Sequence, residues 1–183
     1  MKPRLNNKGF TLIENLIVIS IMAITLSIAY FMMGGKDARA QLKSNSRDIA
    51  SHMKVARTGA IRDSKPWAIQ FDPANGRYLI YNDSGEAVGS EDWSDGDESV
   101  YRTVNLDTRI SYGTDQGMRP GGTSLPGDGI SFSADRVVFN RNGTSESGTV
   151  YLKSDAGDTF AISSLATTGR VKIWSNYGSG WSN

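Results

Sequence analysis

An apolar run near the amino terminus constrains this chain more than any other feature. Between residues 10 and 33 the only ionisable side chains are those of Glu14 and Tyr30. As an α-helix with a rise of about 1.5 Å per residue, the segment spans roughly 36 Å, which exceeds the apolar core of about 30 Å in a typical bilayer. We therefore expect residues 10–33 to form a transmembrane helix.

The residues before the run predict its orientation. Lys2, Arg4 and Lys8 form a basic leader, which is expected to stay on the cytoplasmic side while the rest of the chain crosses the membrane. A secretory signal peptide is the alternative, but its apolar region normally has about 7 to 15 residues. The run in this chain is longer than that, so an anchor is favoured.

Glu14 is the one acidic side chain in the apolar run. A carboxylate inside a bilayer costs roughly 2.5 to 3.5 kcal/mol on insertion scales, and such residues usually face a partner instead of lipid. We therefore expect Glu14 to meet a cation.

Composition excludes several classes of function. The 183-residue chain has a formal net charge of +1, and without positions 1–9 it retains 17 basic and 19 acidic side chains, a formal charge of −2. This balance is not typical of a protein that seeks polyanions. The absence of cysteine rules out disulfides, thiol catalysis and cysteine-ligated metals. We expect no cofactor and no metal site.

The periodicity after the apolar run predicts that the helix continues to about residue 62. Apolar residues recur at helical spacing, and Pro66 ends the pattern because it disfavours helix at the preceding residue. His52 lies beside this stripe, and a lone histidine is more often a packing or surface residue than a metal ligand. The stripe consists of Leu42, Ile49, Met53, Ala56 and Ala60.

Beyond Pro66 the apolar period changes to two, which predicts strands. The segments "WAIQF" and "RYLIY" flank an Asn-Gly turn signal and predict a hairpin. Because no strand alternates with helices, we expect an α+β protein in which an antiparallel sheet, or two packed sheets, lies on the amphipathic half of the helix. The further predicted strands are 100–106, 109–112, 130–132, 137–140, 149–153, 159–163 and 170–174.

Two segments are too long to be simple turns and are expected to be surface loops: 82–99 and 113–129. The first contains seven acidic residues and no basic residue. Its carboxylates could supply oxygen ligands to calcium, but they lack the spacing of an EF-hand loop, so a solvated acidic loop is favoured. The carboxylates in question are Asp92, Asp95, Asp97 and Glu98.

The segment "KGFTLIENLIVISIMAITLSIA" resembles the class III signal of type IV pilins and type II secretion pseudopilins. The resemblance implies that a prepilin peptidase cuts between Gly9 and Phe10, and that Phe10 is then N-methylated. It also implies that Glu14 attracts the amino terminus of a neighbouring subunit during filament assembly, where the low dielectric of the membrane strengthens the attraction.

Later segments are similar to the GspH/FimT branch of pilin-like proteins. The similarity rests on "AR..AI" at the end of the helix, an "F...G" strand and turn, and a late "GR" followed by an alternating strand. The domains implied are a leader at 1–9, a transmembrane and filament-core helix at 10–33, an amphipathic half-helix at 34–65 and a β-rich periplasmic head at 66–183.

The resemblance implies a structural subunit that is not an enzyme. The favoured function is that of a minor pseudopilin of a type II secretion system, held in the bacterial inner membrane until it joins a periplasmic pseudopilus. Its implied partners are other pilins, the prepilin peptidase, the inner-membrane assembly platform and, before assembly, membrane lipid. A minor pilin of a type IV pilus is the alternative. The lone histidine, without a recognisable serine or aspartate motif around it, argues against catalysis.

A third hypothesis is DNA binding, because some FimT-like minor pilins bind DNA through "GRxR" near the carboxyl terminus. Here "GRVK" places Arg170 and Lys172 on one face of a predicted strand, where both could reach phosphate. Against this hypothesis, lysine replaces the second arginine, and the mature head is not basic. The additional candidates are Arg136, Arg141 and Lys153 for phosphate contacts, and Trp174 and Trp181 for stacking.

Overall fold

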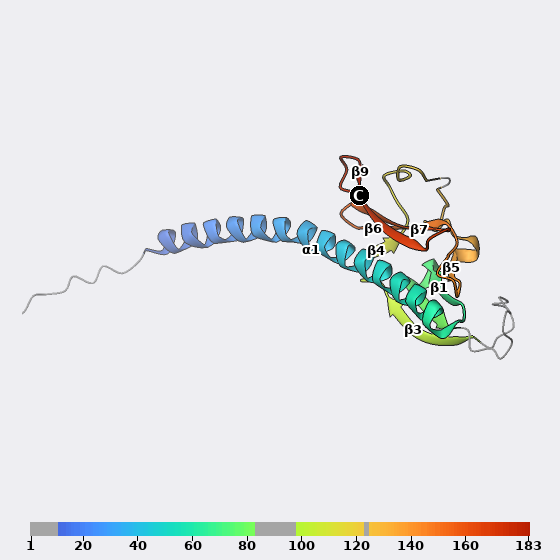
Figure 1. Ribbon diagram of the computed structural model, residues 1–183. Coiled ribbons are helices and arrows are strands. Elements are labelled where there is room, and N and C mark those ends of the chain that lie inside the picture. The colour runs from blue at the N-terminus through green and yellow to red at the C-terminus, as the bar shows by residue number, and fades with distance from the viewer. Residues whose placement is uncertain (1–10, 83–97, 123–124) are drawn as a thin grey trace, which may run out of the picture. The chain divides into compact units, whose positions relative to one another are not determined.

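The computed structural model describes residues 11–82, 98–122 and 125–183, without the side chains of residue 29 and residues 31–36 (Figure 1). The chain divides into two compact units, Met1–Asp37 and Ala38–Asn183. Among the helices in the described residues, none combines enough length with enough apolar character to cross a membrane, so the span expected at 10–33 is not confirmed.

Helix α1 (Leu12–Asp63) includes most of the predicted helix and ends one residue later than expected. Within the second unit it buries the predicted stripe, because Leu42, Ile49 and Met53 are completely inaccessible to solvent. Complete burial of a side chain of this size contributes about 1.5 to 3 kcal/mol. This packing fixes the amphipathic half of the helix on the head.

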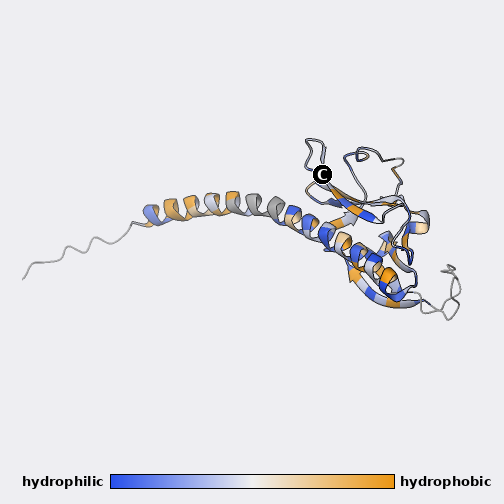
Figure 2. Ribbon diagram, viewed as in Figure 1, coloured by the Kyte–Doolittle hydropathy of each residue, from blue (hydrophilic) through white to orange (hydrophobic). Residues whose placement is uncertain are grey.

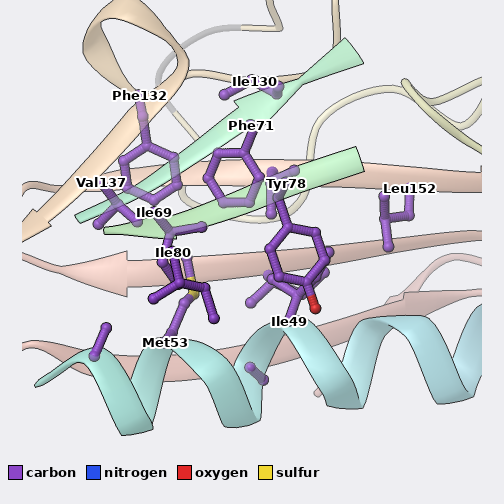
Figure 3. Packing of buried hydrophobic residues seen from close by; sticks show 14 of the residues in the cluster. Ile49, Met53, Ile69, Phe71, Tyr78, Ile80, Ile130, Phe132, Val137 and Leu152 are labelled. Atoms are coloured by element: carbon purple, nitrogen blue, oxygen red, sulfur yellow. The ribbon is translucent and has the colours of Figure 1, made fainter. Parts of the chain in front are cut away.

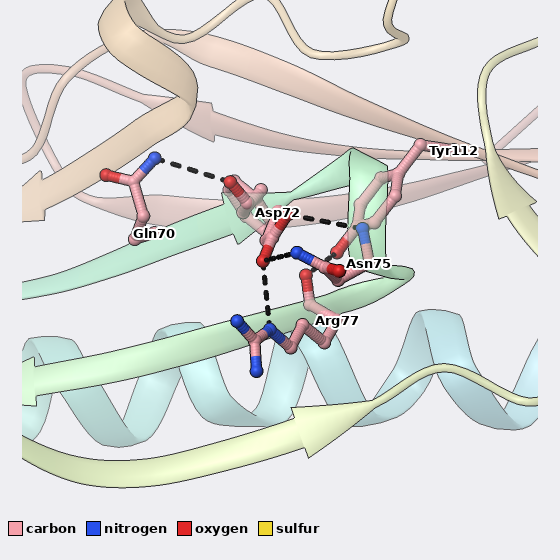
Figure 4. Close-up of polar contacts among 6 residues, drawn as sticks. Gln70, Asp72, Asn75, Arg77 and Tyr112 are labelled. Carbon is pink, nitrogen blue, oxygen red and sulfur yellow. Dashed lines mark hydrogen bonds and ion pairs between the residues drawn. The ribbon is translucent and has the colours of Figure 1, made fainter.

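The first sheet has four strands, all paired antiparallel in the order β3-β2-β1-β5. Its strands are β1 (Trp67–Asp72), β2 (Arg77–Asn82), β3 (Ser99–Asn105) and β5 (Arg136–Phe139). β1 and β2 form the predicted hairpin, which turns through a short 3-10 segment, Pro73–Asn75. The Asp72 carboxylate accepts hydrogen bonds from Asn75 and from Arg77 Nε, at 2.9 Å for the latter (Figure 4).

The second sheet has five antiparallel strands in the order β4-β6-β7-β8-β9. They are β4 (Ile110–Tyr112), β6 (Gly148–Ser154), β7 (Thr159–Leu165), β8 (Arg170–Asn176) and β9 (Trp181–Ser182). The sequence did not predict β9. The predicted α+β class with antiparallel sheets on the helix is confirmed.

One predicted strand is wrong. Within 130–132, Ile130 makes only an isolated bridge to Val150, and Phe132 leads into a 3-10 turn at Ser133–Asp135. The backbone of Ala134 has a φ of 51°, which ends extended structure at this point. The alternation of Ile130 and Phe132 reflects two buried side chains on an irregular segment, because both residues are buried.

The core joins both sheets to α1. Figure 3 shows Ile49 and Met53 of α1 beneath Tyr78, Ile80 and Ile69 of the first sheet. Phe71 of the first sheet meets Tyr112 of the second edge-on, with ring centroids 6.2 Å apart. Tyr112 Oη also donates a hydrogen bond of 2.9 Å to the backbone oxygen of Arg77, which satisfies its buried hydroxyl (Figure 4).

Candidate functional site

The amino-terminal part of α1 exposes apolar side chains on all sides. Figure 2 shows mainly hydrophobic residues along these turns, and the exposed fraction is 83% for Leu12 and 66% for Ile19. The hydroxyl groups of this segment are satisfied internally, since Ser20 Oγ donates to the Leu16 carbonyl at 2.8 Å and Ser27 Oγ to the Ala23 carbonyl at 2.7 Å. An apolar surface of this extent is typical of a membrane or protein contact.

Glu14 lies in the first turn of this helix and is exposed. Its backbone N–H donates to Thr11 Oγ1 at 3.3 Å, so Thr11 caps the helix. The sequence Thr11-Leu-Ile-Glu14 has the Ser/Thr-x-x-Glu spacing of a capping box, a signal that the sequence analysis missed. The carboxylate also complements the partial positive charge of the helix amino terminus. Glu14 therefore has a local structural role besides the predicted one in assembly. Gly9 and Phe10 lie outside the described residues.

Strand β8 places Arg170, Lys172 and Trp174 at alternate positions on one face. Lys172 Nζ lies 5.5 Å from the centroid of the Trp174 ring, within the range of a cation–π contact. The indole N–H of Trp174 donates to Ser163 Oγ on β7 at 3.2 Å, which fixes the ring on the sheet. Arg170 is exposed to solvent.

The structure adds a third cation, Arg119, which the sequence analysis did not single out. The guanidinium of Arg119 lies 5.6 Å from the Trp174 ring centroid, and its Nε donates to Thr149 Oγ1 at 3.0 Å. Arg119 belongs to the predicted loop 113–129, and no sequence pattern placed that loop beside β8. We call Arg119, Arg170, Lys172 and Trp174 the β8 strip.

The other predicted cations are arranged differently. Lys153 Nζ forms an ion pair with Asp115 at 2.9 Å, and Arg136 belongs to β5 in the other sheet. Trp181 meets Tyr151 edge-on, with ring centroids 6.0 Å apart. Of the additional candidates for DNA contacts, Lys153 is therefore engaged in an ion pair and Trp181 in an aromatic pair.

His52 projects from α1 and contacts two strands of the first sheet. Its Nδ1 lies 2.7 Å from Tyr78 Oη, and its Nε2 lies 3.3 Å from Arg102 Nη1. Burial, together with the positive charge of Arg102, lowers the pKa of His52, whereas Asp48 opposes this effect. A neutral imidazole that donates from Nδ1 and accepts at Nε2 satisfies both contacts.

The structure describes only part of the acidic segment 82–99. Of the four carboxylates considered for calcium, Asp92, Asp95 and Asp97 lie outside the described residues. Within the described part of the chain, no group of three histidine, cysteine, aspartate or glutamate side chains could hold a metal ion.

Arg57 of α1 contacts two turns that carry glycines, at Gly143 and Gly169. Its Nε donates to the backbone oxygen of Gly143 at 2.9 Å. Gly169 lies against the same group, because a Cβ there would be 2.4 Å from the Gly143 oxygen and 2.8 Å from Arg57 Nε. Three segments far apart in the sequence, "AR", "NG" and "GR", therefore meet at one point, and this contact sets the position of Arg170.

The chain matches two protein-family profiles. Residues 4–30 match the family described as Prokaryotic N-terminal methylation motif. Residues 45–169, more than half of the chain, match the family described as Type II transport protein GspH. The chain belongs to the GspH family. The resemblance to GspH/FimT-like, type IV pilin-like proteins is thereby confirmed.

Solved structures of pilin-like proteins resemble this GspH-family chain. The minor pseudopilin EpsH from the type 2 secretion system of Vibrio cholerae is 8% identical, with a TM-score of 0.51 over 74% of this chain and 97% of EpsH. The type IV minor pilin FimU of Pseudomonas aeruginosa is 14% identical over 74% of this chain and 89% of FimU, with a TM-score of 0.49. GspH of Escherichia coli is 12% identical over 80% of this chain and 97% of its own, with a TM-score of 0.48.

At these identities, the likeness to EpsH bears on the fold alone. A comparison with curated protein sequences found no match. The GspH family and the pilin-like fold are those of structural pilin subunits. Such subunits are processed by a prepilin peptidase and assemble with other pilins.

Proposed function

We propose that this GspH-family chain is a minor pseudopilin of a type II secretion system. The observation that carries the proposal is the match of residues 45–169 to the Type II transport protein GspH family, behind an amino-terminal methylation motif. The protein then acts by assembly and not by catalysis. It is anchored once in the bacterial inner membrane, with its amino terminus in the cytoplasm and its head in the periplasm, until it enters the pseudopilus.

Deletion of the gene tests this function. We expect the deletion to reduce protein secretion and to leave piliation and natural transformation unchanged. Loss of pili with normal secretion would assign the chain to a type IV pilus instead. Complementation with the full-length chain controls for effects on neighbouring genes.

We propose further that a prepilin peptidase cleaves between Gly9 and Phe10 and that Phe10 is methylated. The new amino terminus then carries a positive charge, which a carboxylate of a neighbouring subunit can meet. The Gly9→Ala variant is expected to keep its leader, so mass spectrometry of the protein recovered from membranes will find the unprocessed mass. A mature mass in this variant would refute the proposed cleavage position.

Glu14 is the carboxylate that we assign to this pairing. Its exposure on the first turn of α1 leaves the side chain accessible to a neighbour. In a low-dielectric environment the attraction between opposite charges is several-fold stronger than in water. The attraction favours a stagger in which one subunit's amino terminus lies beside the Glu14 of the next.

Two substitutions separate this role from helix capping. Glu14→Gln removes the charge but keeps the side-chain shape, whereas Thr11→Ala removes the cap, at a cost of about 0.5 to 2 kcal/mol. We expect Glu14→Gln to insert into the membrane and fail to assemble, and Thr11→Ala to assemble. If both variants fail equally, the role of Glu14 is in the helix end and not in subunit pairing.

A second candidate function is DNA binding at the β8 strip by a minor pilin. It is favoured by one observation, the placement of the Arg119 guanidinium and of Lys172 Nζ at 5.6 and 5.5 Å from the centroid of the Trp174 ring. The two cations are suited to phosphate contacts. The aromatic ring beside them is suited to stacking on a base.

Titration of the full-length chain in detergent micelles with duplex DNA at two salt concentrations tests this candidate. Each lost phosphate contact is expected to reduce the slope of log affinity against log salt by about 1. Arg119→Ala and Lys172→Ala should each have this effect, and Arg47→Ala, on the exposed side of α1, is the matched control. Binding that does not depend on salt would exclude the β8 strip as a DNA site.

A further inference from the structure

Strand β3 forms a seam with α1 along one edge of the head. Asn45 Oδ1 of α1 accepts a hydrogen bond from the Asp107 N–H, just after β3, at 3.3 Å. Further along α1, His52 Nε2 lies 3.3 Å from Arg102 Nη1. β3 is an edge strand of its sheet and is almost entirely exposed, with only Val104 partly buried. In the part of the chain that the structure describes, the outer edge of β3 has no partner strand.

A groove opens in this seam near the carboxyl end of α1. It encloses about 300 Å³, the lower end of the range for ligand pockets. Trp67 lies at its base and packs against Gly59, where a Cβ would be only 2.6 Å from the indole ring. Tyr101 and Val55 line its sides, and their exposed fractions are 57% and 42%. The groove thus offers an aromatic and aliphatic surface for one large side chain.

The charged residues that line this groove are cations, and one carboxylate lies next to it, because Asp63 accepts a hydrogen bond of 3.2 Å from Trp67 Nε1. Lys54 and Arg62 lie on its rim, and none of the described residues that line it is acidic. The side chain of Arg62 forms an ion pair with its neighbour Asp63, with Nε 2.7 Å from Asp63 Oδ1, and is 70% exposed. The rim therefore favours a ligand with negative charge beside its apolar group.

The other end of the seam has the opposite character. A polar groove of about 570 Å³ is lined by Asp48 and Asp107 and by the amide of Gln41. Gln41 Oε1 is buried and accepts no hydrogen bond from the residues that the structure describes. This end favours a ligand that donates hydrogen bonds, as a lysine, arginine or asparagine side chain does.

We propose that the seam binds an extended segment of another subunit of the filament. The segment pairs with the free edge of β3, as in β-strand addition. At one end it places a large apolar side chain, flanked by carboxylates, in the groove at Trp67. At the other end it places a donor side chain between Asp48 and Asp107. This inference rests on the proposed function, because it takes the partner to be a filament subunit.

The test is photo-crosslinking in cells that contain the whole secretion system. Full-length protein carries p-benzoylphenylalanine at Thr58, which is exposed on the groove side of α1, and the matched control carries it at Ser111, exposed on β4. We expect the Thr58 probe to label another pilin-like subunit. Mass spectrometry should map the labelled peptide to a strand with an acidic residue next to a large apolar one.

Charge reversal makes the test specific. The double substitution Lys54→Glu and Arg62→Glu should reduce the labelled product about fivefold, the effect of roughly 1 kcal/mol of lost ion pairing. Lys172→Glu, a reversal on the β8 strip, should leave it unchanged. Unaltered thermal unfolding of the double variant shows that it folds.

Several outcomes would overturn the inference. They are labelling of a second copy of this chain, labelling of the chain's own residues 83–97, equal labelling from Ser111, and labelling that charge reversal does not reduce. The proposed function fails separately: if deletion leaves secretion normal, the chain is not a pseudopilin. If deletion reduces secretion but the Thr58 probe labels nothing in the chain that keeps Lys54 and Arg62, only the seam is refuted.

Discussion

Replacing Gly169 by alanine tests how the late "GR" motif is held. The new Cβ would lie 2.4 Å from the Gly143 oxygen and 2.8 Å from Arg57 Nε, closer than atoms can approach. Gly169 also has a φ of 57°, where an L-residue costs roughly 1 to 2 kcal/mol. The Gly143 carbonyl must move, and the hydrogen bond of 2.9 Å from Arg57 then weakens or breaks.

The expected loss of stability follows from these two effects. A hydrogen bond to a charged donor contributes about 1.5 to 3 kcal/mol. Together with the backbone strain, Gly169→Ala should lower the free energy of unfolding by about 2.5 to 5 kcal/mol. Gly157→Ala is the matched control, because its φ is 85° but nothing lies within 4 Å of the added Cβ. The control should lose only about 1 to 2 kcal/mol.

Urea unfolding of the full-length chain in detergent micelles, followed by tryptophan fluorescence, measures both variants. We expect Gly169→Ala to unfold at clearly lower urea than Gly157→Ala. Equal midpoints would refute the reasoning, because the clash with Gly143 and Arg57 would then carry no cost. The variant Arg57→Ala should reproduce the part of the loss that belongs to the hydrogen bond.

Three further predictions concern other contacts of the head. The pKa of His52 is lowered in the folded chain, so the unfolded chain binds the proton more readily. The contribution of neutral His52 to stability is therefore present above the ordinary pKa of about 6.5 and is lost as pH falls below that value. The urea midpoint should therefore fall more between about pH 7.5 and pH 5 than it does in His52→Asn; parallel curves would contradict this. Asp158→Asn breaks the bidentate pair with Arg39, whose Nε lies 2.8 Å from Asp158 Oδ2, and should cost about 1 to 3 kcal/mol in the same assay. The exposed pair of Arg109 and Asp155 is its control, and Asp155→Asn should shift the urea midpoint much less than Asp158→Asn, because solvent screens an exposed pair. Gly59→Ala should displace the Trp67 ring and shift its fluorescence, and an unchanged spectrum would show that the ring keeps its position despite the added Cβ.

Much of the fold could be predicted because the signals are local. The spacing of Leu42, Ile49 and Met53 predicted which face of α1 is buried, and all three are completely buried. The Asn75-Gly76 step between two alternating segments predicted the β1–β2 hairpin, which the structure contains. Both patterns depend on the geometry of a few consecutive residues, 3.6 per turn in a helix and two per repeat in a strand.

The errors occurred where an adjacent turn or the pairing with another strand decides the local structure. Ile130 and Phe132 alternate as a strand would, yet the turn that begins after Phe132 prevents pairing beyond one bridge. β9 was missed because its two residues acquire strand geometry only by pairing with β8. Alternation alone does not reveal whether a partner strand is available.

The sequence by itself determined the apolar helix with Glu14 in its first turn, the amphipathic stripe and the change to a strand period after Pro66, because each is a periodic or compositional property of neighbouring residues. Tertiary structure alone brought Arg119 to Trp174 and Arg57 to Gly143, and it opened the seam between α1 and β3. These contacts join segments separated by tens of residues. Their positions depend on how the helix and the two sheets pack, which local periodicity does not specify.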